Sequence, residues 1–230
     1  MVYGKSTFLN MIAGFEKITE GELLLDNGPI LKPGKNRGFV FQDFALYPWK
    51  TVKGNIRMPL EIGGEKSDKE IETAVNEYIK FVGLKGFENA YPHILSGGMK
   101  QRVGLARALV YNPDVLLMDE PFGALDAQTR KLMQQELIRI WELESERGKK
   151  KTVVFITHSV IEAVYLADKI YVMSARPGHI KAVIDVPIKR PRSYTEESYV
   201  EKREEVLSYL EEEVTKADEQ MRKVGTVHFD

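Results

Sequence analysis

Residues 94–126 constrain what this chain can fold into more than any other stretch. They open with Ser96-Gly97-Gly98, a small polar turn, and continue from Met99 to Val110 as a predicted helix. The apolar face of this helix consists of Val103, Ala106, Leu109 and Val110. A helix that starts with Ser and two glycines presents unpaired backbone N–H groups that no side chain covers. Such a start is an anion site, and phosphate suits it.

Two adjacent carboxylates follow in the second half of this stretch. Asn112-Pro113-Asp114 ends the helix, and the apolar run 115–118 predicts a short buried strand. Asp119 and Glu120 come directly after this run, at the carboxyl end of the strand, where the chemistry of an open α/β sheet usually lies. One carboxylate can hold Mg²⁺ through water, and the other can polarise an attacking water.

Each half has an ordinary explanation by itself, because Ser-Gly-Gly is usually a plain turn and an Asp-Glu pair is usually a solvated strand end. Together, at this spacing, they resemble the ATP-binding subunit of ABC transporters. "LSGGM" is similar to the family signature, "VLLMDE" to Walker B and "GALD" to the D-loop. The resemblance runs from Gly4 to about Pro191. It implies an α/β P-loop NTPase fold, with a mostly parallel sheet flanked by helices and a helical subdomain that carries the signature.

The start of the chain resembles the second half of a P-loop. Gly4-Lys5-Ser6-Thr7 precedes a predicted helix, and its N–H groups would cradle phosphate. In such a loop Lys5 reaches the β- and γ-phosphates and Ser6 binds Mg²⁺. The motif is weak by itself and gains its specificity from residues 94–126.

The first glycine of the pattern G-x-x-x-x-G-K-[ST] would lie before Met1. The strand that feeds the loop and the aromatic residue that stacks on adenine in the family would also lie there. We therefore expect the sequence to be incomplete at its N-terminus, within Walker A. Without those parts we expect poor ATP binding, and a catalytically impaired fragment or pseudo-subunit is the alternative function.

The resemblance assigns the remaining catalytic roles. Asp119 holds the Mg²⁺ water, and Glu120 is the general base or orients the attacking water. Gln42, after a predicted strand at 37–41, is the Q-loop residue that binds Mg²⁺ and senses the γ-phosphate. His158, after a predicted buried strand at 152–156, is the switch histidine. Phosphoryl transfer needs charge neutralisation and an aligned water, and this set with Lys5 supplies both.

The family geometry also implies a dimer that binds ATP and Mg²⁺. The signature turn lies far from its own P-loop, so two chains must face each other head to tail. Ser96, Gly97 and Gly98 of one chain then contact the nucleotide held by Lys5 and Ser6 of the other. Asp126 caps the next helix, predicted from Ala127 to about residue 147, and its D-loop crosses the same interface.

The domain plan is a single ABC ATPase domain over residues 1–230. It contains a helical subdomain at about 52–112, in which Ser67 and Glu70 form a capping box, and a helical extension at about 193–224. The segment 43–52 is rich in aromatic residues. We expect Phe44 in the core, and Tyr47 and Trp49 where membrane permease subunits dock.

The composition and the net charge limit where the protein can act and which partners it can have. The net charge is −1 and the chain has no cysteine, which gives no sign of nucleic acid as a partner and no disulfide framework. We expect a peripheral protein at the cytoplasmic face of the membrane, which meets a solute-binding protein only indirectly. "LYPWKTV" and residues 174–192 resemble the nitrate, sulfonate and taurine importer ATPases. A soluble ABC ATPase that acts on nucleic acid or ribosomes is a weaker alternative, because a second cassette, coiled-coil inserts and basic patches are missing.

Overall fold

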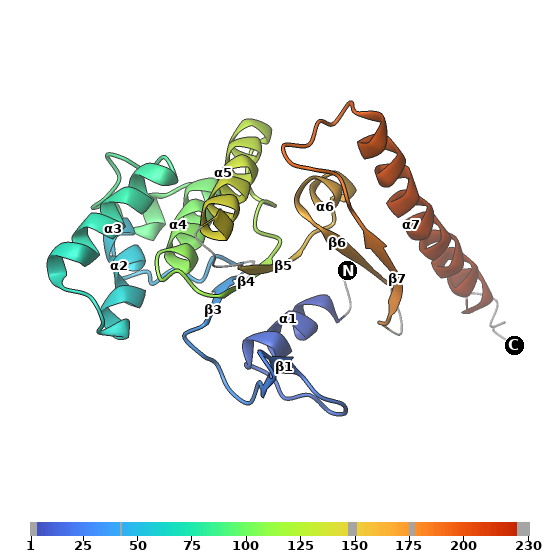
Figure 1. Cartoon of the computed structure of the whole chain (residues 1–230), viewed down its shortest axis with the longest axis horizontal. Coiled ribbons are helices and arrows are strands. Elements are labelled where there is room, and N and C mark those ends of the chain that lie inside the picture. The colour runs from blue at the N-terminus through green and yellow to red at the C-terminus, as the bar shows by residue number, and fades with distance from the viewer. Residues whose placement is uncertain (1–3, 42, 147–150, 175–177, 225–230) are drawn as a thin grey trace, which may run out of the picture. The chain divides into compact units, whose positions relative to one another are not determined.

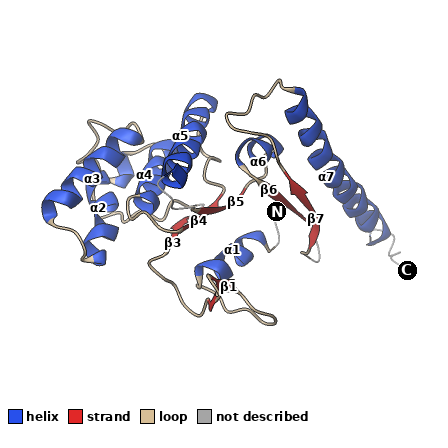
Figure 2. Ribbon diagram, in the orientation of Figure 1, coloured by secondary structure: helices blue, strands red, loops and turns tan. Residues whose placement is uncertain are grey.

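The computed structural model describes residues 4–41, 43–146, 151–174 and 178–224. The chain forms two compact units. The larger unit comprises residues 7–156, and the smaller unit comprises residues 1–6 and 157–230. Figure 1 labels most of their helices and strands, and Figure 2 separates the strands from the helices by colour.

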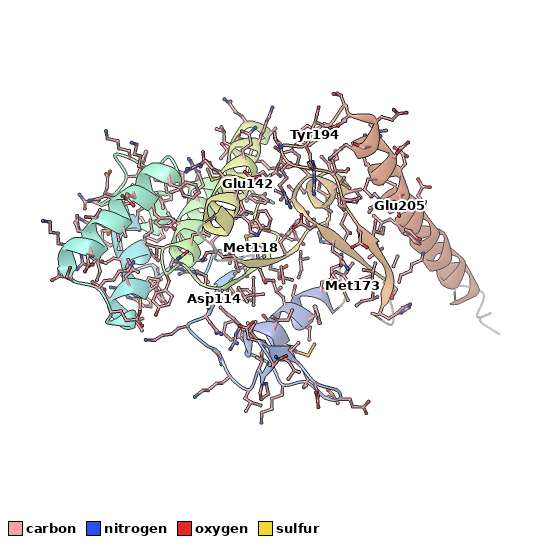
Figure 3. All side chains as sticks on the ribbon, viewed as in Figure 1. Asp114, Met118, Glu142, Met173, Tyr194 and Glu205 are labelled. Carbon is pink, nitrogen blue, oxygen red and sulfur yellow. The ribbon has the colours of Figure 1, made fainter. Side chains whose placement is uncertain are left out.

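A three-stranded parallel sheet forms the centre of the larger unit. Its order is β3 (Arg37–Val40), β4 (Val115–Asp119) and β5 (Thr152–Ile156). All residues of β4 are buried, because this strand is paired on both edges and covered on its faces. Figure 3 shows Asp114 just before this strand and Met118 on it. The predicted α/β fold with a parallel sheet is confirmed.

Helix α1 (Lys5–Ala13) covers part of this sheet. Leu9 and Ala13 pack with Val115 and Leu117 of β4 in one apolar cluster. A small hairpin follows, in which β1 (Leu24–Leu25) pairs antiparallel with β2 (Gly28–Pro29). Its turn residues Asp26 and Asn27 have φ of 49° and 63°, values that suit a tight two-residue hairpin turn.

Strand β5 differs from its prediction. We expected a buried strand, but Thr152 is exposed and the other four residues are only half-buried. The reason is its position, because β5 lies at the end of the strand order and pairs with β4 alone among the described residues. An apolar run therefore predicted the strand correctly and its burial incorrectly.

The helical part of the larger unit has a core of its own. It consists of α2 (Val52–Gly63), α3 (Asp68–Phe81), the 3₁₀ turn η1 (Pro92–Ile94) and α4 (Gly97–Leu109). Its buried apolar residues come from all three α-helices, among them Ile56, Val75 and Val103. This is the segment that the sequence predicts to be helical.

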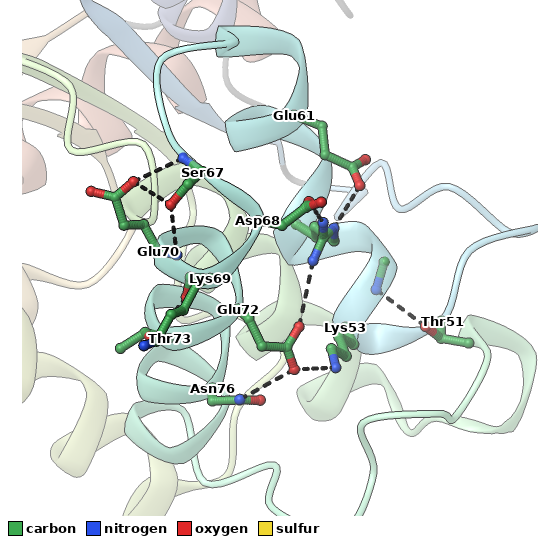
Figure 4. A network of polar contacts seen from close by, with 12 residues as sticks. Thr51, Lys53, Glu61, Ser67, Asp68, Lys69, Glu70, Glu72, Thr73 and Asn76 are labelled. Carbon is green, nitrogen blue, oxygen red and sulfur yellow. Dashed lines mark hydrogen bonds and ion pairs between the residues drawn. The ribbon is translucent and has the colours of Figure 1, made fainter.

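Polar contacts fix how α3 begins and how it meets α2. Ser67 and Glu70 form the predicted capping box at the start of α3, with the Ser67 N–H donating to Glu70 Oε2 at 2.8 Å. On the outer surface Glu72 bridges Lys53 and Arg57 of α2 (Figure 4). These three side chains are half-buried, and ion pairs near the surface contribute little individually, so the apolar core carries most of the packing.

The smaller unit contains α6 (Val160–Leu166), the antiparallel strands β6 (Lys169–Met173) and β7 (Ile180–Asp185), and α7 (Glu197–Val224). Helix α7 contacts α6, β6 and β7, and the Tyr199 hydroxyl donates to the Ile161 carbonyl at 2.8 Å. Tyr194 and Glu205 mark this region in Figure 3. The C-terminal helix therefore packs on its own unit, as its apolar spacing suggests.

A buried arginine joins the segments of the smaller unit. Arg192 donates to the carbonyls of Val164, Tyr165 and Ala167 at the end of α6, at 2.7, 3.1 and 2.7 Å. It also donates to the carbonyls of Val186 and Ile188, which follow β7. Burial lowers the pKa of Arg192 to about 10, so the guanidinium stays charged at neutral pH.

Candidate functional site

The end of β4 places the two candidate carboxylates. Asp119 is the last residue of the strand and is 7% exposed, whereas Glu120 is half-buried. Glu120 has a φ of 49°, in the left-handed region that a side chain other than glycine rarely adopts. A proline follows it, and a residue before proline normally avoids helical conformations. Backbone strain of this kind is characteristic of functional sites.

Hydrogen bonds hold the Glu120 backbone on both sides. Its N–H donates to the Ile156 carbonyl of β5 at 3.0 Å. Its carbonyl accepts from the Gly123 N–H at 3.1 Å and from Gln101 Nε2 of α4 at 3.2 Å. The candidate general base is therefore attached to the sheet, to its own loop and to the signature helix.

The signature turn lies beside the D-loop of the same chain. Ser96 is the N-cap of α4, with its Oγ accepting from the Met99 N–H at 3.3 Å, and the helix begins at Gly97, earlier than predicted. A Cβ on Gly98 would lie 3.6 Å from the Ala124 carbonyl and 3.5 Å from Leu125. Ser96 and Gly97 are exposed, so their polar groups are accessible to a ligand.

Asp126 caps α5 (Ala127–Glu146) as predicted. Its Oδ1 accepts from the backbone N–H groups of Thr129 at 3.0 Å and of Gln128 at 3.1 Å. Hydrogen bonds from Thr129, and then from Gln128, lower the pKa of Asp126. The carboxylate is exposed and keeps its charge next to the signature turn.

The other predicted site residues lie elsewhere along the chain. Gly4 has a φ of 89°, and Ser6 and Thr7 are exposed in the first turn of α1, with Lys5 half-buried. His158 is exposed in the turn before α6, where Ser159 caps the helix. Gly4, Lys5, Ser6 and His158 belong to the smaller unit, whereas Asp119, Glu120, Asp126 and the signature turn come together in the larger unit. Gln42 lies outside the described residues.

Three comparisons identify the family. The ABC transporter family model matches residues 3–123. An uncharacterized ABC transporter ATP-binding protein of Methanocaldococcus jannaschii is 50% identical over 214 residues, which cover 93% of this chain and 78% of the relative. The aliphatic sulfonates import ATP-binding protein SsuB of Bacillus cereus is 48% identical over 208 residues, or 90% of this chain and 79% of the relative. The chain belongs to the ABC transporter family.

Solved structures agree with this assignment. A bacterial ABC transporter cassette, solved as a dimer, superposes with a TM-score of 0.71 at 35% identity over 81% of this chain and 82% of that one. A dimeric post-hydrolysis state of an ATP-binding cassette bound to ADP and phosphate gives 0.70 with the same coverage. The chain is an ATP-binding subunit of an ABC transporter and an ATPase.

This ABC subunit also holds its aromatic segment in a fixed shape. Asn55 of α2 is fully buried; its side chain accepts from the Tyr47 N–H and donates to the carbonyls of Tyr47, Lys50 and Thr51. Trp49 is 69% exposed, and its ring centroid lies 5.7 Å from that of Tyr47.

Arg107 of α4 fixes the start of the same segment. It donates to the carbonyls of Phe44 and Ala45 and lies 5.3 Å from the Tyr47 ring centre. Phe44 and Ala45 have φ of 60° and 42°, so the backbone turns its carbonyls toward Arg107. The Phe44 side chain is only half-buried. The prediction that Phe44 lies in the core is therefore wrong.

A groove of 510 Å³ lies next to this segment within the larger unit of the ABC subunit. Its apolar lining includes Phe39, Phe41, Tyr47, Met58, Ile62 and Tyr111. Its charged lining residues are all basic: Lys35, Arg37 and Arg107. The Nε atom of Arg37 is buried and has no hydrogen-bond partner among the described residues. Apolar side chains and basic groups therefore line the groove together.

No described helix combines the length and the apolar character that crossing a membrane would require.

Sequence reasoning missed Asn55, Arg107 and Gln101. Gln101 and Arg107 bond residues 19 and 63 positions away, so no local pattern distinguishes them from solvated polar residues of α4. A polar residue within an apolar helical spacing was the available signal, and Asn55 beside Ile56 is the clearest case.

Proposed function

We propose that this ABC subunit powers an importer for a small solute by binding Mg²⁺-ATP between two copies of itself. One observation carries the proposal: the larger unit brings Glu120, the exposed signature turn and the D-loop of Asp126 into one neighbourhood. We further propose one cassette domain over residues 1–230, with a helical subdomain at 52–112 and a helical extension at 193–224.

The chain's own residues supply the phosphate contacts. The exposed N-terminus of α1, with Gly4, Ser6 and Thr7, suits an anion because unpaired N–H groups and the helix dipole favour negative charge. Lys5 neutralises the β- and γ-phosphates. Gln42 orients the attacking water from the Q-loop, and His158 contacts the γ-phosphate.

The donor set fits Mg²⁺. This ion prefers oxygen ligands, and it usually binds through one or two carboxylates together with substrate phosphates. Asp119 offers a buried carboxylate, Ser6 an exposed hydroxyl and Gln42 an amide oxygen. An ion held there would supply positive charge next to the phosphoryl group, and Glu120 would accept the proton of the attacking water.

The exposure of the signature turn supports a head-to-tail dimer. Ser96 and Gly97 lie open at the N-terminus of α4, where a phosphate bound to another copy can meet the helix start. Both superposed cassettes were solved as dimers. ATP then links the two copies, and hydrolysis separates them, so binding shifts a two-state equilibrium.

The basic, apolar groove supports docking of a membrane permease. An apolar permease segment would dock on Tyr47, Trp49 and the groove, with an acidic group beside the basic residues of the groove. The subunit itself would lie on the cytoplasmic face of the membrane. The SsuB relative and a taurine import protein TauB of Rhizobium johnstonii, 45% identical over 92% of this chain and 78% of the relative, support a small organic sulfonate as the solute.

Removal of Mg²⁺ tests the nucleotide part of the proposal. We expect ATP hydrolysis to fall to background with EDTA, to return with excess Mg²⁺, and to rise more than linearly with subunit concentration, because two copies form each site. The chain of residues 1–230 is assayed beside a form in which a complete phosphate loop precedes Gly4. Absence of hydrolysis in both forms, with both folded, would refute the proposal.

A second experiment tests the docking surface. We expect Trp49→Ala to reduce co-purification with the permease subunits at least tenfold, because large exposed aromatic residues dominate such interfaces, and to leave the hydrolysis rate of the isolated subunit within twofold. Leu31→Ala, at an exposed apolar residue outside the groove, is the matched control. Equal retention of both variants on the permease would exclude this surface as the docking site.

A further inference from the structure

Gln101 has an unusual environment for a helical glutamine. It lies on α4, in the turn that follows the signature residues, and it is only 3% exposed. Its Nε2 donates to the Glu120 carbonyl at 3.2 Å, while its Oε1 is buried without a partner among the described residues. A buried amide oxygen left without a partner costs stability, which argues against a purely structural reason for an amide here.

The bond reaches the main-chain carbonyl of the residue that carries the candidate general base. Glu120 holds a strained left-handed conformation, and the following Pro121 and Phe122 are buried. Hydrogen bonds to the Glu120 carbonyl from Gly123 and Gln101 therefore help to hold the backbone conformation from which the side chain projects. A displacement of about 1 Å at a reacting group can lower a rate by about 10²-fold.

Helix α4 is itself held close to the aromatic segment. A Cβ on Gly104 would lie 3.4 Å from the Phe44 carbonyl, and Arg107 binds that same carbonyl. One helix thus carries the signature turn at its start, Gln101 one turn later and Arg107 near its end. A rigid helix transmits a shift at one of these points to the others.

We propose that Gln101 is a positioning residue that couples the signature helix to the Glu120 carboxylate through the Glu120 carbonyl. The inference rests on the proposed function, in which Glu120 acts on the attacking water. A contact of the signature turn with one nucleotide then influences the orientation of Glu120 at the other site. The amide donor of Gln101, and not its volume, performs this role.

Two variants separate the donor from its volume. Gln101→Met keeps an unbranched side chain of similar size without the donor, and Gln101→Glu keeps the shape but places a carboxylate against the Glu120 carbonyl. We expect kcat to fall about tenfold in Gln101→Met and further in Gln101→Glu, with KM for ATP within twofold of the parent.

The matched control is Arg102→Met on the same helix. Arg102 donates to the carbonyls of Val82 and Gly83 at 3.1 and 3.4 Å, so its loss removes a similar bond that does not reach Glu120. We expect this variant to lose stability and to keep kcat within twofold. An unchanged kcat in Gln101→Met, or an equal loss in Arg102→Met, would overturn the proposal.

Amide hydrogen exchange gives a readout that does not need ATP hydrolysis. The Gly123 N–H shares the Glu120 carbonyl with Gln101, so we expect its exchange to quicken at least tenfold in Gln101→Met and to stay unchanged in Arg102→Met. Unchanged exchange at Gly123 in Gln101→Met overturns the positioning role. Failure of hydrolysis in every form, with exchange altered as expected, refutes the proposed function and leaves the attachment of Glu120 to α4 established.

Discussion

Glu120→Gln is expected to lower the rate of ATP hydrolysis about 10²–10³-fold and to leave ATP affinity within a few-fold. The amide has the shape of the carboxylate but cannot accept a proton from the attacking water. The backbone bonds that Glu120 makes to Ile156, Gly123 and Gln101 involve only its main chain, so the fold of the loop is retained. Single-turnover hydrolysis and equilibrium binding of ATP measure the two quantities separately.

The control for this experiment is Glu77→Gln, which makes the same chemical change at an exposed position of α3. Its hydrolysis rate should match that of the parent. A Glu120→Gln subunit that hydrolyses ATP within tenfold of the parent rate would remove Glu120 from the role of general base. The attacking water would then have to be activated by another group, with His158 the next candidate.

Arg192→Met is expected to lower the free energy of unfolding of the smaller unit by about 3 kcal/mol. The guanidinium meets five backbone carbonyls, three of them at the end of α6, where the helix dipole also favours a cation. Methionine fills much of the volume but leaves these carbonyls without their donors. Chemical denaturation, followed by amide exchange in α6 and β7, measures the loss.

Lys189→Met serves as the reference, because Lys189 is an exposed cation in the same segment. Its free energy of unfolding should change by less than about 0.5 kcal/mol. Arg192→Lys should retain only part of the stability, since an ammonium group cannot span carbonyls on two segments as a guanidinium fork does. If Arg192→Met has the same free energy of unfolding as the parent, the buried arginine does not join α6 to the segment after β7.

Local patterns predicted the elements of this fold and the candidate carboxylates. The run 115–118 became a fully buried strand that delivers Asp119 and Glu120, and the capping box of Ser67 and Glu70 formed as predicted. These features depend on neighbours a few residues away. The burial of β5 and of Phe44 depended on tertiary context, and both were predicted incorrectly.

The positions of polar side chains within the site could not be predicted from the sequence. Gln101 and Glu120 are 19 residues apart, and Arg107 and Phe44 are 63 residues apart. Nothing in the local pattern of α4 distinguishes these two side chains from the solvated ones on the same helix. Only the packing of that helix on the sheet and on the aromatic segment reveals what each side chain contacts.

The buried amide of Asn55 has a consequence for binding kinetics and affinity. Four hydrogen bonds, one accepted and three donated by this side chain, hold the backbone of residues 47, 50 and 51 before any partner arrives. Association therefore loses little conformational entropy in this loop, and Trp49 is already presented to the partner. The surface would bind a rigid segment rapidly and without a folding step. A partner that binds and dissociates repeatedly would therefore meet the same shape each time.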